Sequence, residues 1–111
     1  MDSILTSIKK MLGITEEYTH FDQELIMYIN SAFTILNQLG VGPANPFFIT
    51  DKNDTWDDFI TDGSLEAVKT YVYYRVKTSF DPPTSSFVLD SIKKQMDELE
   101  WRMNVIVENN N

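Results

Sequence analysis

The stretch Ser79-Phe80-Asp81-Pro82-Pro83-Thr84-Ser85-Ser86, followed by the run from Phe87 to Val107, decides the fold of this chain. A proline fixes φ, lacks an amide donor and pushes the preceding residue out of the α region, so no helix continues through Pro82-Pro83. The hydroxyl of Ser85 or Ser86 then offers an acceptor to the free N–H groups of a new helix. The sequence therefore predicts two helices separated by a sharp break.

The helix after the break, residues 86–104, is the most strongly specified in the sequence. Its acid-first pairs at i, i+4, Asp90/Lys94 and Glu98/Arg102, have the order that favours surface pairing. Apolar residues also recur at spacings of 3, 4, 3 and 4 and form a seam on one face: Leu89, Ile92, Met96, Leu99 and Met103. The rest of the chain must supply the surface that buries this seam.

Length and composition set the class of protein. With 111 residues, 42% of them hydrophobic and 23% charged, the chain reads as one globular domain. It has no cysteine, which excludes a disulfide scaffold, a thiolate zinc site and a cysteine nucleophile. No apolar run approaches the ~20 residues of a membrane span, and the N-terminus lacks the features of a secretory signal. The net charge of −8 argues against DNA as a tightly held ligand.

Three earlier segments also show helical periodicity: a short unit over 2–12 and main helices near 21–39 and 64–79. The last of these is rich in β-branched and aromatic residues, so a strand is the rival interpretation. Helix is preferred because the 3–4 spacing runs from Leu65 to Phe80. The seam of the 86–104 helix is expected to pack against one stripe of the 21–39 helix: Leu25, Ile29, Phe33 and Leu36.

A long acidic loop follows the 21–39 helix, and Thr55–Ile60 within it predicts one helical turn that holds the loop to the body. The predicted fold is therefore all-α, a small bundle of three to four main helices with a long acidic loop between the second and third. Five loop residues fall at positions of a calcium-binding EF-hand frame: Asp51, Asn53, Thr55, Asp57 and Asp62. The frame has Trp56 where glycine is required and lacks the final glutamate, so no metal site is predicted.

No catalytic constellation is visible. His20 is the single histidine, with no second histidine or cysteine to complete a site. The sequence also lacks a phosphate-binding glycine pattern and a nucleophile elbow. We therefore expect a protein that is not an enzyme and that uses no cofactor and no metal.

Large amphipathic side chains exceed what one small core can easily hide. Four of them are candidates for a subunit interface, because tyrosine, tryptophan and arginine are enriched there: Tyr71, Tyr74, Trp101 and Arg102. Packing between the 64–79 and 86–104 helices is an equally weighted alternative. The domain is expected to span 1–104, with a flexible C-terminal tail at 105–111. Val105, Ile106 and Val107 in this tail favour β structure and suit strand addition to a partner.

The chain resembles the head–tail connector (adaptor) proteins of tailed phages, specifically siphophages, over residues 4 to 105. The motifs that carry the resemblance occur in order: Asn30-Ser31-Ala32-Phe33, Leu36-Asn37-Gln38-Leu39-Gly40-Val41-Gly42-Pro43, Val68-Lys69-Thr70-Tyr71-Val72-Tyr73, Phe80-Asp81-Pro82-Pro83-Thr84-Ser85-Ser86 and Glu98-Leu99-Glu100-Trp101-Arg102. Each motif alone is weakly specific, and their order, spacing and total length give the match its strength.

This resemblance implies a small helical subunit, made in the bacterial host cytoplasm and located in the neck of the virion. It implies a homo-oligomeric ring, commonly a dodecamer, that docks below the portal protein after DNA packaging. Such a ring extends the DNA channel toward a stopper or tail-completion protein, helps retain the packaged DNA and uses neither catalysis nor a cofactor. DNA passes through it without sequence-specific binding, and no membrane is involved.

Two other classes of function fit the composition. An acidic inhibitor that mimics DNA would be monomeric or dimeric and would bind a basic cleft. A small helical regulatory binding module would show neither a ring nor affinity for a portal. An acidic ring would repel the DNA backbone and let it slide, which agrees with the connector interpretation.

Overall fold

The computed structural model describes residues 2–110, and Met1 and Asn111 lie outside this part. Its helices are α1 (Ile4–Met11), α2 (Asp22–Gln38), α3 (Trp56–Phe59), α4 (Leu65–Phe80) and α5 (Ser86–Asn110). Between residues 2 and 110 there is no β-strand, only an isolated antiparallel bridge between Ser3 and Thr55. The all-α prediction is confirmed, including the choice of helix over strand for α4.

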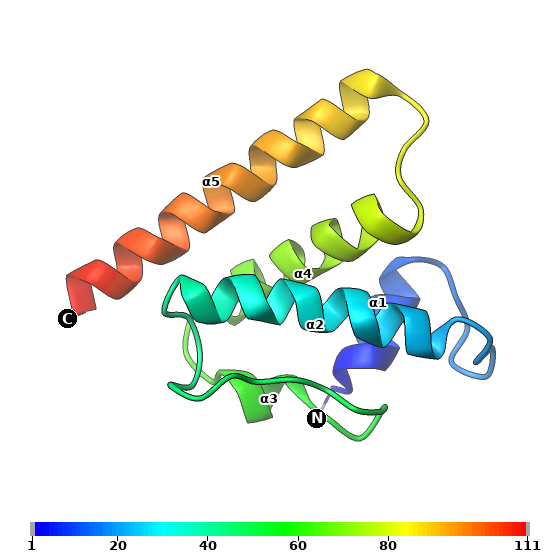
Figure 1. Cartoon of the computed structure of the whole chain (residues 1–111), viewed down its shortest axis with the longest axis horizontal. Helices are drawn as coiled ribbons and strands as arrows, with labels where there is room; N and C mark the ends of the chain where they lie inside the picture. Colours follow the sequence, from blue (N-terminus) through cyan, green and yellow to red (C-terminus); the bar gives the residue numbers. More distant parts are fainter. Residues whose placement is uncertain (1, 111) are drawn as a thin grey trace.

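Helix α4 is central, because it contacts both α2 and α5, while α1 contacts α2. Figure 1 shows α5, in yellow to red, along one edge of the molecule, with α3 and the start of α1 at the opposite edge. The molecule measures 42 × 36 × 19 Å. Since a helix with its side chains is about 10–12 Å wide, the thin direction holds about two helical layers.

The break between α4 and α5 lies where the double proline predicts it. Helix α4 ends at Phe80 and α5 begins at Ser86. The amide of Val88 donates to Oγ of Ser85 at 3.4 Å, so Ser85 is the one of the two predicted caps that bonds to the first turn.

The core lies between α2 and α4 and continues beneath the loop that joins them. Its fully buried apolar residues follow the predicted stripes of both helices: Leu25, Ile29, Phe33 and Leu36 on α2, and Val68, Val72 and Val76 on α4. The periodicity of the sequence therefore identified the inner faces of both helices correctly.

The partner predicted for the α5 seam is corrected by the structure. The seam packs against α4 and makes only minor contact with α2. Met96 and Met103 are buried, whereas Leu89, Ile92 and Leu99 are only partly buried. The stripe on α2 is covered instead by α1, α4 and the aromatic loop, so α5 has a single helix for support.

The loop between α2 and α4 is held to the body by aromatic and amide contacts. Phe33 meets the rings of Phe47 and Phe59 with centroids 5.1 and 4.7 Å away. The Asn30 side chain donates to the Ile49 carbonyl at 3.0 Å and accepts the Ile49 amide at 2.8 Å, as a neighbouring strand would. The predicted helical turn is confirmed as α3, which a capping box between Thr55 and Asp58 closes.

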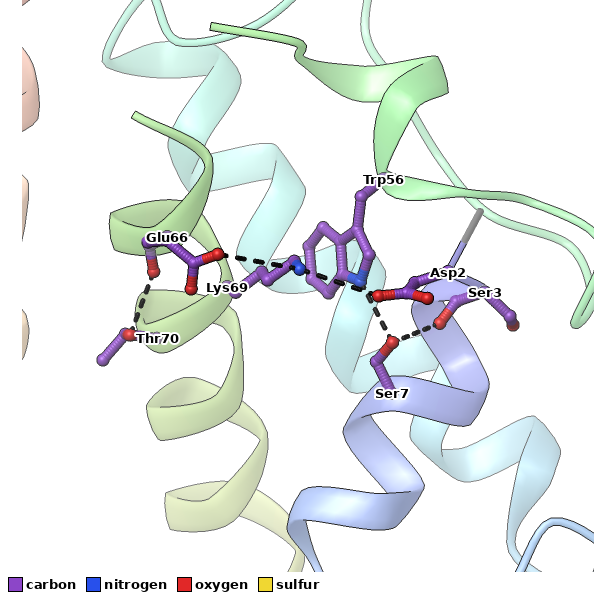
Figure 2. A network of polar contacts seen from close by, with 7 residues as sticks. All are labelled: Asp2, Ser3, Ser7, Trp56, Glu66, Lys69 and Thr70. Atoms are coloured by element: carbon purple, nitrogen blue, oxygen red, sulfur yellow. Dashed lines mark hydrogen bonds and ion pairs between the residues drawn. The ribbon is translucent and has the colours of Figure 1, made fainter. Parts of the chain in front are cut away.

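Trp56 joins α3 to two other helices (Figure 2). Its indole Nε1 donates to Oγ of Ser7 on α1 at 3.2 Å, and Nζ of Lys69 on α4 lies 5.9 Å from the ring centroid. The indole is 1% exposed, so the acidic loop is anchored by a core residue at the tip of its short helix.

Lys9 is a buried cation at the junction of α1 and α2. The side chain is 2% exposed, and Nζ lies 2.9 Å from Oδ1 of Asp22 in the first turn of α2. Nζ also donates to the carbonyls of Glu16 and Tyr18 at 3.0 and 2.7 Å. One ammonium group therefore fixes the connection between the two helices by three contacts.

We expect Lys9→Met to lower the free energy of unfolding by about 2–3 kcal/mol, because two carbonyls and a partly buried carboxylate lose their donor. Chemical denaturation at neutral pH measures this loss. Lys10→Met, at the exposed neighbouring position, is the control and should change stability by less than about 0.5 kcal/mol. Equal effects of the two substitutions would show that the buried ion pair has no structural role.

Candidate assembly surface

Helix α5 exposes large apolar side chains along its length, because α4 covers only one of its faces. Near its start, Phe87 is 82% and Val88 44% exposed. Toward its end, Trp101 is 67% and Ile106 48% exposed. An exposed apolar surface of this kind on a small protein commonly marks a site of association.

Trp101 and Arg102 both lie on the solvent-exposed side of α5. Nη2 of Arg102 is 2.6 Å from Oε1 of Glu98 one turn earlier, the i, i+4 pair that the sequence predicts. Both members of this pair are exposed, so it contributes little to stability in water. The pair and the Trp101 ring are available to a partner, and their role as an interface stays a prediction.

Tyr71 is a core residue and offers no free surface, which corrects its candidacy for a subunit interface. The side chain is 0% exposed, and its hydroxyl donates to Oε2 of Glu100 on α5 at 2.8 Å. The guanidinium of Arg75 lies 6.0 Å from the centroid of its ring. Tyr71 therefore joins α4 to α5, which is the packing alternative that the sequence left open.

Tyr74 makes a similar link between the two helices. Its hydroxyl donates to Oε1 of Gln95 at 2.6 Å, and its ring is partly buried. The structure thus brings Tyr71 and Tyr74 together at the α4–α5 contact. Trp101 is exposed on another side of α5, whereas Arg102 is exposed at the edge of this contact, near Tyr74 and Gln95.

Residues 105–110, predicted as part of the flexible tail 105–111, are helical: α5 continues through Asn110 instead of ending near residue 104, and Asn111 lies outside the described residues. Val105 and Val107 are partly buried, and Ile106 is exposed. A Cβ atom built on Gly40 would lie 3.0 Å from Cγ1 of Val107, so this end of α5 packs closely against the end of α2. Helical packing overrides the β preference of the three residues.

A cavity of about 400 Å³ opens beside this end of α5. Its walls come from three segments of the chain and present both polar and apolar surface; the apolar side chains among them are Val41, Phe59, Ile60, Met103, Ile106 and Val107. Asp62 and Ser64 also line it. A Cβ atom on Gly42, where φ is +87°, would meet the Phe59 ring at 2.5 Å, so only glycine lets this wall form.

Sequence reasoning missed both this cavity and the exposed Phe87. The signal for Phe87 was present, because Phe87 and Val88 are apolar residues that lie off the Leu89–Met103 seam. The cavity had no such signal, since its walls are far apart in sequence and depend on how the loop returns to α5.

The carboxylates of the acidic loop have local partners. The Asp54 side chain accepts the amides of Thr50 and Asp51, and that of Asp58 accepts the amide of Thr55. Hydrogen bonds from the hydroxyl and the amide of Ser64 lower the pKa of Asp62. Among residues 2–110 no three His, Cys, Asp or Glu side chains are grouped as a metal ion would require. Asp54, Asp58 and Asp62 therefore serve as turn and cap residues.

His20 lies at the entry to α2, where its ring meets the edge of Phe21 with centroids 4.8 Å apart. The side chain is exposed. Its geometry is that of a residue packed at a helix entry.

Within the described part of the chain, no helix has both the length and the apolar character needed to cross a bilayer.

The fold and the exposed face of α5 describe a small helical subunit suited to assembly. A family model described as "Phage connector protein" matches residues 4–110, so the chain belongs to the phage connector family. Membership indicates a structural role at the head–tail connection in the neck of a phage particle, in association with portal and other head–tail components. The comparisons with curated proteins and with solved structures gave no significant match.

The buried hydroxyl of Tyr71 predicts a loss of stability in alkaline solution. Burial, and then the hydrogen bond to Glu100, raise the pKa of Tyr71 well above its ordinary value of 10.0. The neutral phenol is favoured in the folded state, so its stabilisation is complete below about pH 10 and is lost as the pH rises further. We expect unfolding free energies measured from pH 8 to 11.5 to fall by up to about 1.4 kcal/mol per pH unit above pH 10.

Tyr71→Phe should cost about 0.5–1.5 kcal/mol at neutral pH and make the alkaline slope shallower. Tyr18→Phe, at an exposed tyrosine, is the control. An unchanged slope in Tyr71→Phe would contradict the assignment.

Proposed function

We propose that this chain is an adaptor subunit that assembles into a ring, a dodecamer, beneath the portal of a tailed phage. The ring extends the DNA channel toward a stopper or tail-completion protein, helps retain the packaged DNA and helps join the tail. Membership in the phage connector family over residues 4–110 is the observation that carries this proposal. It also favours the connector function over a DNA-mimicking inhibitor or a regulatory module.

The shape of the subunit supports side-by-side packing in a ring. With a thickness of 19 Å against 42 and 36 Å in the other directions, the molecule is a slab. Helix α5 occupies one edge of this slab (Figure 1) and exposes Trp101 and Arg102. Aromatic and arginine side chains of this kind contribute most of the binding energy in many interfaces. We place the neighbouring subunit against them.

The distribution of charge supports passage of DNA through the ring. The net charge is −8, and residues 51–62 alone hold five aspartates against one lysine. A channel with acidic walls repels phosphates and so prevents DNA from adhering to it. The same charge opposes subunit association, which makes assembly on the portal more favourable than assembly in free solution, because many weak contacts act together there.

The C-terminal end of α5 is the proposed contact with the portal, through Val105, Ile106 and Val107. Because these residues are helical, docking would place a helix in an apolar groove in place of the strand addition that the sequence indicated. Ile106 is the member of the three that is free to enter such a groove, since 48% of it is exposed.

To test this function, the purified chain is mixed with portal protein, and the number of copies bound to each portal is measured by native mass spectrometry. We expect the natural chain to form a full ring on the portal. Trp101→Ala should leave the portal partly occupied, because it weakens the association between subunits about 10-fold or more. Met27→Ala, at a 60% exposed position on α2, is the control and should fill the portal. Full occupancy by Trp101→Ala would remove Trp101 from the subunit interface.

Val105→Ser in the same assay separates portal docking from ring contact, because Val105, unlike Ile106 and Val107, does not line the cavity beside α5. The portal contact predicts fewer bound rings, each with its normal number of subunits. Complete absence of rings from portals with the natural chain would contradict the connector function itself.

A further inference from the structure

Two features lie at opposite ends of α5, an exposed aromatic ring and a cavity. Phe87, in the first turn, is the most exposed large apolar side chain among those described. The cavity of about 400 Å³ lies at the other end of the helix, with Met103, Ile106 and Val107 in its walls. Even an apolar cavity of about 150 Å³ accepts a benzene ring, so this one has room for a phenyl group.

A chain cannot fill its own cavity with its own Phe87. The two lie 16 to 20 residues apart on one helix, which is about 24–30 Å at 1.5 Å per residue. A helix is too stiff to fold back over that distance. The occupant must therefore come from another molecule, and a second copy of this chain provides a suitable ring in every subunit.

The charges on α5 are complementary in the same direction. Residues 86–95 contain Lys93 and Lys94 against the single acid Asp90, whereas residues 96–110 contain four acids against Arg102. Lys94 follows Phe87 by seven residues, two helical turns, and so shares its face. Asp62 lies at the cavity, and its pKa is lowered, so it is charged at neutral pH. A neighbour that brought Phe87 to the cavity would also bring its lysines toward these acids.

We propose that Phe87 of one subunit inserts into the cavity between the α2–α4 loop and the end of α5 in the next subunit. Val88, 44% exposed beside it, adds apolar contact at the rim. Because the inserted residue and the cavity are different parts of the surface, the contact is heterologous, and each copy can donate to one neighbour and receive from the other. Repetition of such a contact gives a ring where the rotation between neighbours closes and a filament where it does not. This inference therefore rests on the ring of the proposed function and names its contact.

The first test measures self-association on the portal. Phe87→Asp should weaken ring assembly about 10- to 30-fold, as loss of a buried aromatic contact does, and should leave thermal unfolding of the free subunit unchanged, since Phe87 is exposed there. Met27→Asp is the control, because it also places a charge at an exposed apolar position, but on α2. This variant should assemble normally. Normal assembly of Phe87→Asp would overturn the inference.

The second test is a disulfide cross-link, which the absence of cysteine makes specific. In the chain carrying Ser86→Cys and Thr61→Cys, one thiol lies beside Phe87 and the other at the cavity, because Thr61 lines it. Mild oxidation of portal-bound protein should give a ladder of covalent oligomers beyond the dimer. The matched control carries Ser86→Cys with Ser31→Cys, at an exposed serine on α2. It should give at least about 10-fold less cross-linked product.

The outcomes distinguish the proposed contact between subunits from the proposed connector function. A ladder from the cavity pair alone supports the contact. Portal-bound protein with equal products from both pairs would overturn the contact and leave the connector function standing. Failure of the natural chain to bind the portal at all would overturn both.

Discussion

The reversal of the chain at Pro82-Pro83 is the constraint on which the rest of the structure depends. Neither proline can continue a helix, so α4 must stop and α5 must start again at Ser86. The two helices are thereby adjacent, and the hydroxyls of Tyr71 and Tyr74 donate across the contact to Glu100 and Gln95. Since α4 also contacts α2, α5 has one supporting helix and a long free face.

That free face connects the fold to the function. A helix buried on all sides would add stability but no site for assembly, whereas α5 retains exposed aromatic rings near both ends. The acidic loop likewise combines buried and surface residues. Trp56 and Phe59 of its short helix are buried in the core, while its aspartates remain near the surface. The core thus fixes the positions of the groups that we propose for contact with other subunits, the portal and passing DNA.

The sequence predicted what depends on local chemistry and periodicity. The double proline, the 3–4 spacings and Ser85 were enough to locate the helices and the inner faces of α2 and α4. What depends on tertiary packing could not be predicted in this way. The burial of Lys9 was not predicted, although its place four residues after Leu5 indicated the buried face. For Tyr71 the sequence left a subunit interface and helix packing equally weighted, because nothing local showed that Glu100 would meet its hydroxyl. The end of α5 was predicted as a flexible tail with a β preference, because local preference ignores the packing of Val107 against Gly40 in the turn after α2.

Backbone hydrogen exchange in the free and portal-bound subunit tests most directly whether α5 is the assembly helix. The free face predicts that amides in residues 86–110 exchange readily in the free protein and gain about tenfold protection or more on the portal. Amides in α2, which lies in the core, should change little. Assembly on the portal with unchanged exchange in α5, and new protection confined to α1 or α2, would contradict the account.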